Sequence, residues 1–167
     1  MLSAQRGFTL IELLVVIAIM SIVGAFTLAN FRSFGEDQKF KNVLLDIQSI
    51  FRTAQTNAKS NVKCETQYGS TWQVEFTNAT KINLKCSTST GPQKVLQLNQ
   101  NDQNILISSV SGTSCTGAMP FTVNFASLSG NVSFSGYPNC TSLTINLTNS
   151  KSNKSLIIEQ GGRIYEK

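Results

Sequence analysis

The chain has 167 residues, of which 14 are Lys or Arg, 9 are Asp or Glu and none is His, so its formal net charge is +5. The lack of histidine excludes His-based acid–base catalysis, Ser-His-Asp triads and His-ligated zinc sites. The length suits one modest domain with an additional segment. We interpret the mild positive charge as a solvated basic surface rather than as a nucleic-acid or anionic-lipid footprint.

An apolar run extends from Phe8 to Phe31 and contains one ionisable residue, Glu12. As a helix with a rise of ~1.5 Å per residue it covers about 36 Å, enough to cross a hydrocarbon core of ~30 Å. It exceeds the apolar region of an ordinary secretory signal, usually ~7–15 residues, and no small-x-small cleavage site follows it. We therefore expect a membrane-spanning helix. A carboxylate inside such a segment is costly, so Glu12 requires a partner.

The stretch RGFTLIELLVVIAI, which starts at Arg6, resembles the prepilin signal of type IV pilins and type II secretion pseudopilins. The shared features are a short basic leader, the Gly7-Phe8 step and a glutamate at the fifth position counted from Phe8. The resemblance implies that a prepilin peptidase cuts between Gly7 and Phe8 and methylates the new amine of Phe8. It also implies that Glu12 pairs with the first amine of a neighbouring subunit, which would satisfy two buried charges together. An ordinary signal anchor is the alternative.

The helical pattern continues beyond this run, with apolar residues at spacings of three and four. Most polar and charged residues lie off this stripe, which predicts an amphipathic helix that ends near Lys59 and whose apolar face is covered by a sheet. Gly35 interrupts the pattern between the two halves and permits a bend. The stripe consists of Phe40, Val43, Leu44, Ile47, Ile50, Phe51, Ala54 and Ala58.

After Ser60 the sequence changes to short alternating or β-branched segments separated by Gly, Asn, Pro or Ser, which is typical of strands. Residues 128–130 and 160–162 are expected to form tight hairpin turns. One long helix followed by many strands predicts an α+β domain with antiparallel sheets. The expected strands lie at 72–76, 80–85, 94–98, 104–110, 121–127, 131–134, 142–147, 154–159 and 162–165.

The cysteines are Cys64, Cys86, Cys115 and Cys140, and no two of them form a CxxC motif. An even number in a loop-rich polar sequence indicates disulfides, with three possible connectivities. We prefer sequential pairing, because neighbouring strands are usually neighbours in space. Disulfides imply an oxidising compartment, which places this part of the chain outside the cytoplasm. The alternative, buried free thiols in a cytosolic protein, conflicts with the N-terminal segment.

The stretches FASLSGNVSF, SLTINLTN and SLIIEQGGRIYEK resemble the closing pattern of the GspH/FimT-like minor pseudopilins. Phe125, Gly130, Gly162 and Arg163 occupy the positions of that pattern. Two departures from major pilins favour a minor role. Many major pilins have a proline inside the membrane helix, where this chain has Ala29, and many close a disulfide loop near the C-terminus, whereas the last cysteine here lies well short of the end.

These observations predict four parts: a prepilin leader at 1–7, a transmembrane and filament-core helix at 8–34, an amphipathic helix at 35–60, and a β-rich periplasmic or extracellular domain at 61–167. The expected fold is α+β and type IV pilin-like, with one long N-terminal helix packed on antiparallel β-sheets. The chain would be a single-pass inner-membrane protein with its C-terminal domain in the periplasm, extracellular if assembled into a pilus.

The expected function is that of a minor pilin or pseudopilin that assembles into, or primes, a type IV pilus or a type II secretion pseudopilus. Its expected partners are the prepilin peptidase, other pilin or pseudopilin subunits, the inner-membrane assembly platform and the lipid bilayer. No cofactor or metal is expected, and the chain would be the substrate of an enzyme rather than an enzyme. One alternative is a major pilin. Another is a DNA-binding minor pilin that uses Lys151, Lys154 and Arg163, although the nearby Glu159 and Glu166 favour a solvated rim.

Overall fold

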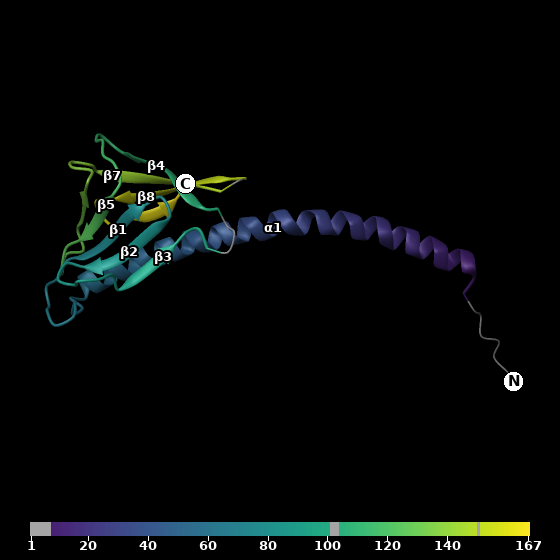
Figure 1. Ribbon diagram of the computed structural model, residues 1–167, viewed down its shortest axis with the longest axis horizontal. Helices are drawn as coiled ribbons and strands as arrows, with labels where there is room; N and C mark the ends of the chain where they lie inside the picture. Colours follow the sequence, from purple (N-terminus) through teal and green to yellow (C-terminus); the bar gives the residue numbers. More distant parts are fainter. Residues whose placement is uncertain (1–7, 101–103, 150) are drawn as a thin grey trace. The chain divides into compact units, whose positions relative to one another are not determined.

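The computed structural model describes residues 8–100, 104–149 and 151–167, with the side chains of 26–34 left out of the description. The chain divides into two compact units, Met1–Gln38 and Lys39–Lys167. The element order is one long helix, α1 (Leu10–Lys59), followed by strands β1 to β9 (Figure 1).

The part of α1 that belongs to the second unit is amphipathic, as its sequence predicts. Every residue of the expected apolar stripe is at most 8% exposed, whereas Lys41, Asp46 and Arg52 point to solvent. Phe51 lies at the centre of this face, with its ring centroid 5.9 Å from that of Phe76 and 6.3 Å from that of Phe125. Sheet residues therefore cover the apolar face of the helix.

One sheet has five antiparallel strands in the order β3-β2-β1-β5-β6. They are β1 (Trp72–Asn78), β2 (Lys81–Cys86), β3 (Lys94–Gln97), β5 (Phe121–Phe125) and β6 (Val132–Ser135). Strands β1 and β5 alternate strictly between buried and half-buried residues over their paired lengths, because one face meets the core and the other faces outward.

The second sheet has four antiparallel strands in the order β4-β7-β8-β9. They are β4 (Leu106–Gly112), β7 (Ser142–Thr148), β8 (Asn153–Glu159) and β9 (Ile164–Glu166). Their buried residues join those of α1 and of the five-stranded sheet in one hydrophobic core. The α+β, pilin-like fold predicted from the sequence is confirmed.

Each strand expected from the sequence is present, with ends displaced by a few residues at most. The two expected turns are also present. Gly130 (φ +66°) lies in the turn between β5 and β6, and Gly162 (φ +80°) lies in the turn between β8 and β9. Glycine adopts such left-handed angles at little cost, which explains its position in both turns.

Two disulfides join the cysteines in sequential pairs, as preferred from the sequence. Cys64–Cys86 ties the loop after α1 to the end of β2, with a Cα–Cα distance of 5.9 Å. Cys115–Cys140 ties the segment after β4 to the segment before β7, with a Cα–Cα distance of 5.2 Å. Both bridges lie within the second unit and close loops between its elements.

Candidate assembly and processing site

The N-terminus of α1 is closed by a reciprocal hydrogen-bond pair between Thr9 and Glu12. The Thr9 amide and hydroxyl both donate to Oε2 of Glu12, at 3.0 Å and 2.9 Å, and the Glu12 amide donates to Oγ1 of Thr9 at 3.3 Å. This is a capping box, which satisfies amides that have no partner at a helix start. The sequence interpretation missed this role, although the spacing Thr-x-x-Glu indicates it.

The capping box leaves part of the Glu12 carboxylate available. Both Thr9 donors reach Oε2, and no donor from the described residues reaches Oε1. A carboxylate offers about four acceptor positions, so Glu12 can cap its own helix and still accept a further hydrogen bond. The local geometry is therefore compatible with a partner from outside the chain.

The described apolar side chains of the first unit, from Phe8 to Val23, are exposed on every side of the helix. Polar Ser21 is accommodated because its hydroxyl donates to the carbonyl of Ile17 at 2.8 Å. The exposed side chains include those of Phe8, Leu10, Ile11, Leu14, Val16, Ile19, Met20 and Val23. Gly7, the other half of the predicted cleavage step, lies outside the described residues.

Within the part of the chain that the structure describes, no helix combines the length and the apolar character that a membrane crossing requires.

The basic residues considered for DNA contact lie on and around β8 and β9, where acidic side chains also lie. Lys154 forms an ion pair with Glu166. Arg163 lies 3.9 Å from Glu159 and 5.5 Å from the ring centroid of Tyr165. Lys151 is exposed. These pairings reduce the positive charge that the surface offers to phosphates, and the DNA-binding hypothesis stays a prediction.

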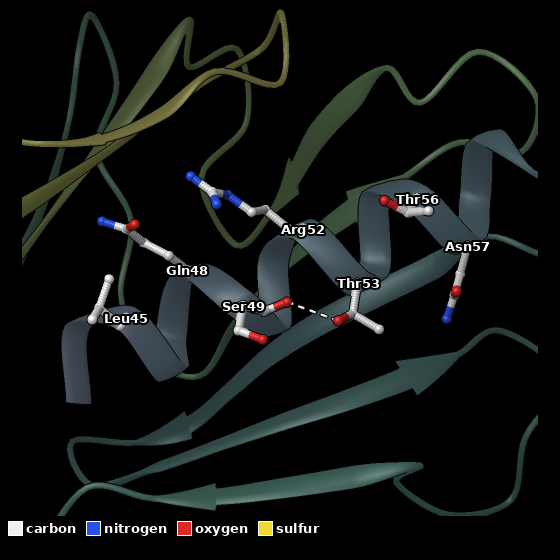
Figure 2. Close-up of a pocket in the computed structure, with 7 residues that line it drawn as sticks. All are labelled: Leu45, Gln48, Ser49, Arg52, Thr53, Thr56 and Asn57. Carbon is white, nitrogen blue, oxygen red and sulfur yellow. Dashed lines mark hydrogen bonds between the residues drawn. The ribbon is translucent and has the colours of Figure 1, made fainter. Parts of the chain in front are cut away.

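A shallow groove of about 360 Å³ follows the outer face of α1 in the second unit (Figure 2). Its polar groups carry one charge, that of Arg52, and the Thr53 hydroxyl donates to the Ser49 carbonyl at 2.8 Å. No carboxylate or cysteine lines it, so it offers neither a metal site nor a nucleophile with a base. The lining residues are Leu45, Gln48, Ser49, Arg52, Thr53, Thr56 and Asn57.

Across residues 8–100, 104–149 and 151–167, no group of three or more His, Cys, Asp or Glu side chains could hold a metal ion. The chemical features that stand out in the first unit are instead a capped carboxylate and an apolar helix surface. They accompany an α+β fold that is pilin-like.

Residues 2–28 match the family model of the prokaryotic N-terminal methylation motif. This motif is the type IV prepilin-like signal, and it spans Gly7, Phe8 and Glu12. It indicates a type IV pilin-like protein that a prepilin peptidase processes and that assembles with other pilins. No curated protein and no solved structure matches the chain.

Proposed function

We propose that the chain is a minor pilin or pseudopilin of the GspH/FimT kind that assembles into, or primes, a type IV pilus or a type II secretion pseudopilus. One observation carries the proposal: the methylation motif at residues 2–28 leads directly into a capped helix with apolar side chains exposed on all sides. A helix that is apolar all round requires apolar surroundings. Lipid would supply them before assembly, and the helices of neighbouring subunits afterwards.

In this proposal, residues 1–7 are the leader and the peptidase cuts between Gly7 and Phe8 on the cytoplasmic side of the inner membrane. The same enzyme methylates the amine of Phe8. Residues 8–34 then form the anchor and filament core, and the rest of the chain lies in the periplasm. The disulfides Cys64–Cys86 and Cys115–Cys140 support this location, because such bonds persist in oxidising compartments.

The assembly contact pairs Glu12 with the Phe8 amine of a neighbouring subunit. Thr9 occupies Oε2 of Glu12, so Oε1 is the oxygen that would accept the incoming amine. Either charge alone is costly in apolar surroundings, whereas the pair compensates much of that cost. The contact therefore favours one register between adjacent helices. In this role Glu12 is a docking group and the chain is a building block, not an enzyme.

The minor role is supported by the C-terminal pattern that resembles the GspH/FimT group. Phe125 ends β5 in the core at 0% exposed, Gly130 and Gly162 occupy turns with positive φ, and Arg163 precedes β9. Each residue of the pattern thus has a structural position that fits its type. The further partners proposed are the inner-membrane assembly platform and the other subunits of the filament.

Substitution of Glu12 tests the charge pair separately from the capping box. Glutamine at this position keeps an acceptor for the Thr9 amide but lacks the charge. We expect Glu12→Gln to be processed normally and to remain in the membrane fraction, while its incorporation into sheared filaments falls at least about tenfold, equivalent to ~1.4 kcal/mol of lost docking. Normal assembly of Glu12→Gln combined with failure of Glu12→Ala would assign Glu12 to capping alone and overturn the charge pair.

Substitution of Gly7 tests the proposed cleavage separately from assembly. Gly7→Leu should block cleavage, so that mass spectrometry finds the precursor N-terminus, whereas the wild type should begin at a methylated Phe8. An intact Met1 in mature filaments would contradict the proposed processing.

The abundance of the chain in sheared filaments distinguishes a minor subunit from the major one.

A further inference from the structure

Three apolar side chains project from the end of the globular unit where α1 stops. They are Val62 (40% exposed), Tyr68 (66%) and Leu128 (70%), and we refer to them together as the apolar tip. Val62 and Tyr68 belong to the loop that follows α1, and Leu128 belongs to the turn between β5 and β6. The core of the same unit is at most 8% exposed, and the other large apolar side chains that the unit exposes lie on its helix and strands: Leu45 on α1, Val95 on β3, Leu106 on β4 and Tyr165 on β9.

Hydrogen bonds hold the two loops of the apolar tip together. Oδ1 of Asn61 accepts from the Gly69 amide at 2.6 Å and from the Ser127 hydroxyl at 3.2 Å. The Leu128 amide donates to the Ala58 carbonyl at 2.9 Å, which satisfies an acceptor at the end of α1. The projecting side chains are therefore displayed from one ordered structure rather than from independent loops.

Leu128 is unfavourable in its position for two separate reasons. Its φ is +66°, in the left-handed region that leucine rarely adopts. It also exposes 70% of its surface to water. Asparagine or glycine would remove both costs while keeping the turn, as Gly130 does two residues later at the same φ. Strained residues of this kind gather where the side chain is used, which suggests that Leu128 serves a contact.

A lysine accompanies each of the two most exposed side chains. The stem of Lys59 runs against Gly130 beside the Leu128 turn, so close that a Cβ atom on Gly130 would lie 2.7 Å from its Cγ. The Lys63 ammonium lies 4.8 Å from the ring centroid of Tyr68. An aromatic or aliphatic residue with an adjacent lysine suits a membrane interface, where the apolar part enters the acyl boundary and the cation stays among the headgroups.

We propose that the apolar tip docks onto the surface of a bilayer that contains anionic lipids. Leu128 and Tyr68 would enter the interface, while Lys59 and Lys63 would meet the headgroup phosphates, whose negative charge complements them. Three side chains expose at most a few hundred Å², well below the ~800 Å² per partner of a stable protein–protein contact. A bilayer needs no fitted pocket, so a small projecting patch suffices. The inference goes beyond the proposed function and does not depend on it.

The test uses the full chain and places a fluorescent reporter in the apolar tip. Trp72 is 5% exposed and gives a constant buried background, so Leu128→Trp adds one reporter at the tip. With vesicles of phosphatidylglycerol that carry brominated acyl chains, we expect the added emission to be quenched severalfold more than with brominated phosphatidylcholine. Ser133→Trp, on the outward face of β6, is the matched control and should not be quenched. The two variants share the same N-terminal segment, so membrane binding through that segment affects both alike.

Two further variants separate the apolar and the charged contributions. Leu128→Asn, read through Tyr68→Trp in the same chain, should lose most of the quenching while unfolding at the same or a higher temperature than the parent. The pair Lys59→Gln and Lys63→Gln should remove the preference for phosphatidylglycerol. Equal quenching at positions 128 and 133, equal quenching in both lipids, or quenching that requires a second copy of the protein would each overturn the proposal.

Discussion

The two units of the chain differ in how far the apolar side chains of α1 are buried. In Lys39–Lys167, the apolar stripe of α1 is buried under two sheets, and the Phe51 side chain has no exposed surface. In Met1–Gln38, the described apolar side chains of the same helix remain largely exposed, with Leu13 and Leu14 at about 60%. One stretch of helix is covered by the sheets of its own unit, whereas the described apolar side chains of the other stretch are exposed.

This difference follows from two different apolar patterns along α1. A stripe at spacings of three and four matches one flat surface, and the sheets supply that surface. A helix that is apolar all round matches lipid or a ring of other helices instead. The sequence pattern changes from one kind to the other near Gly35, so the difference in exposure follows from periodicity rather than from helix propensity.

Two neighbouring leucines of α1 in the second unit test the contrast between buried and exposed side chains most strongly. Leu44 is 2% exposed and Leu45 is 61% exposed, although they are adjacent on α1. Leu44→Ala should lower the free energy of unfolding by about 2–5 kcal/mol, because it leaves a cavity in the core. Leu45→Ala should change it by no more than about 0.5 kcal/mol. Urea unfolding followed by the fluorescence of Trp72 measures both.

Leu14→Ala extends this test to the first unit. Its leucine is as exposed as Leu45, so the stability of the globular unit should again be unchanged. If Leu14→Ala destabilised the domain as much as Leu44→Ala does, the first unit would contribute to the core, and the contrast between the two units would be wrong.

The fold followed from the sequence because its strongest signals are local. Alternation in segments such as FTVNF and SLTINL marks strands whose faces differ, and the stripe from Phe40 to Ala58 marks the covered side of the helix. The division of the strands between two sheets could not be predicted, because pairing β1 with β5 brings together residues far apart in the sequence. The apolar tip was missed for a similar reason, since its parts are brought together by hydrogen bonds of Asn61 and Leu128 with residues distant in the sequence.

The two disulfides constrain only the second unit. Their sequence separations are 22 and 25 residues, so removing either bridge should lower the free energy of unfolding by about 3 kcal/mol. Cys64→Ala/Cys86→Ala and Cys115→Ala/Cys140→Ala are the matched variants, and thermal unfolding is the measurement. A loss below about 1 kcal/mol for either pair would show that the sheets already restrict those loops.

Part of the candidate site could be predicted from the sequence, and part could not. Glu12 was identified because a single carboxylate in an apolar run is conspicuous. Its hydrogen bonds with Thr9 were not anticipated, although the spacing of the two residues suffices for a capping box. The consequence is that Glu12 has a local role as well as a proposed one between subunits. Only variants such as glutamine, which separate shape from charge, can distinguish them.

The two units also differ in the partners of their carboxylates, and the expected effect on stability is small. Glu12 has no cationic partner among the described residues, whereas Glu75 on β1 lies 2.6 Å from the Lys85 ammonium and accepts a hydrogen bond from Asn83 at 3.0 Å. The hydrogen bond from Lys85, and then that from Asn83, lower the pKa of Glu75 below its ordinary value of 4.5. Because the folded pKa is lower than the unfolded one, the pair stabilises the fold above about pH 4.5 and loses this contribution as the pH falls through the folded value.

Glu75→Gln should therefore lower the free energy of unfolding by roughly 0.5 kcal/mol at pH 7 and by progressively less below pH ~4.5, because the ion pair is partly exposed. Lys85→Gln should cause a similar loss, and the double variant little more than either single one, since all three remove the same interaction. Urea unfolding at several pH values measures these differences, and salt at about 1 M should reduce them. Additive losses in the double variant would mean that Glu75 and Lys85 contribute to stability independently. The ion pair between them would then not be the source of the stabilisation.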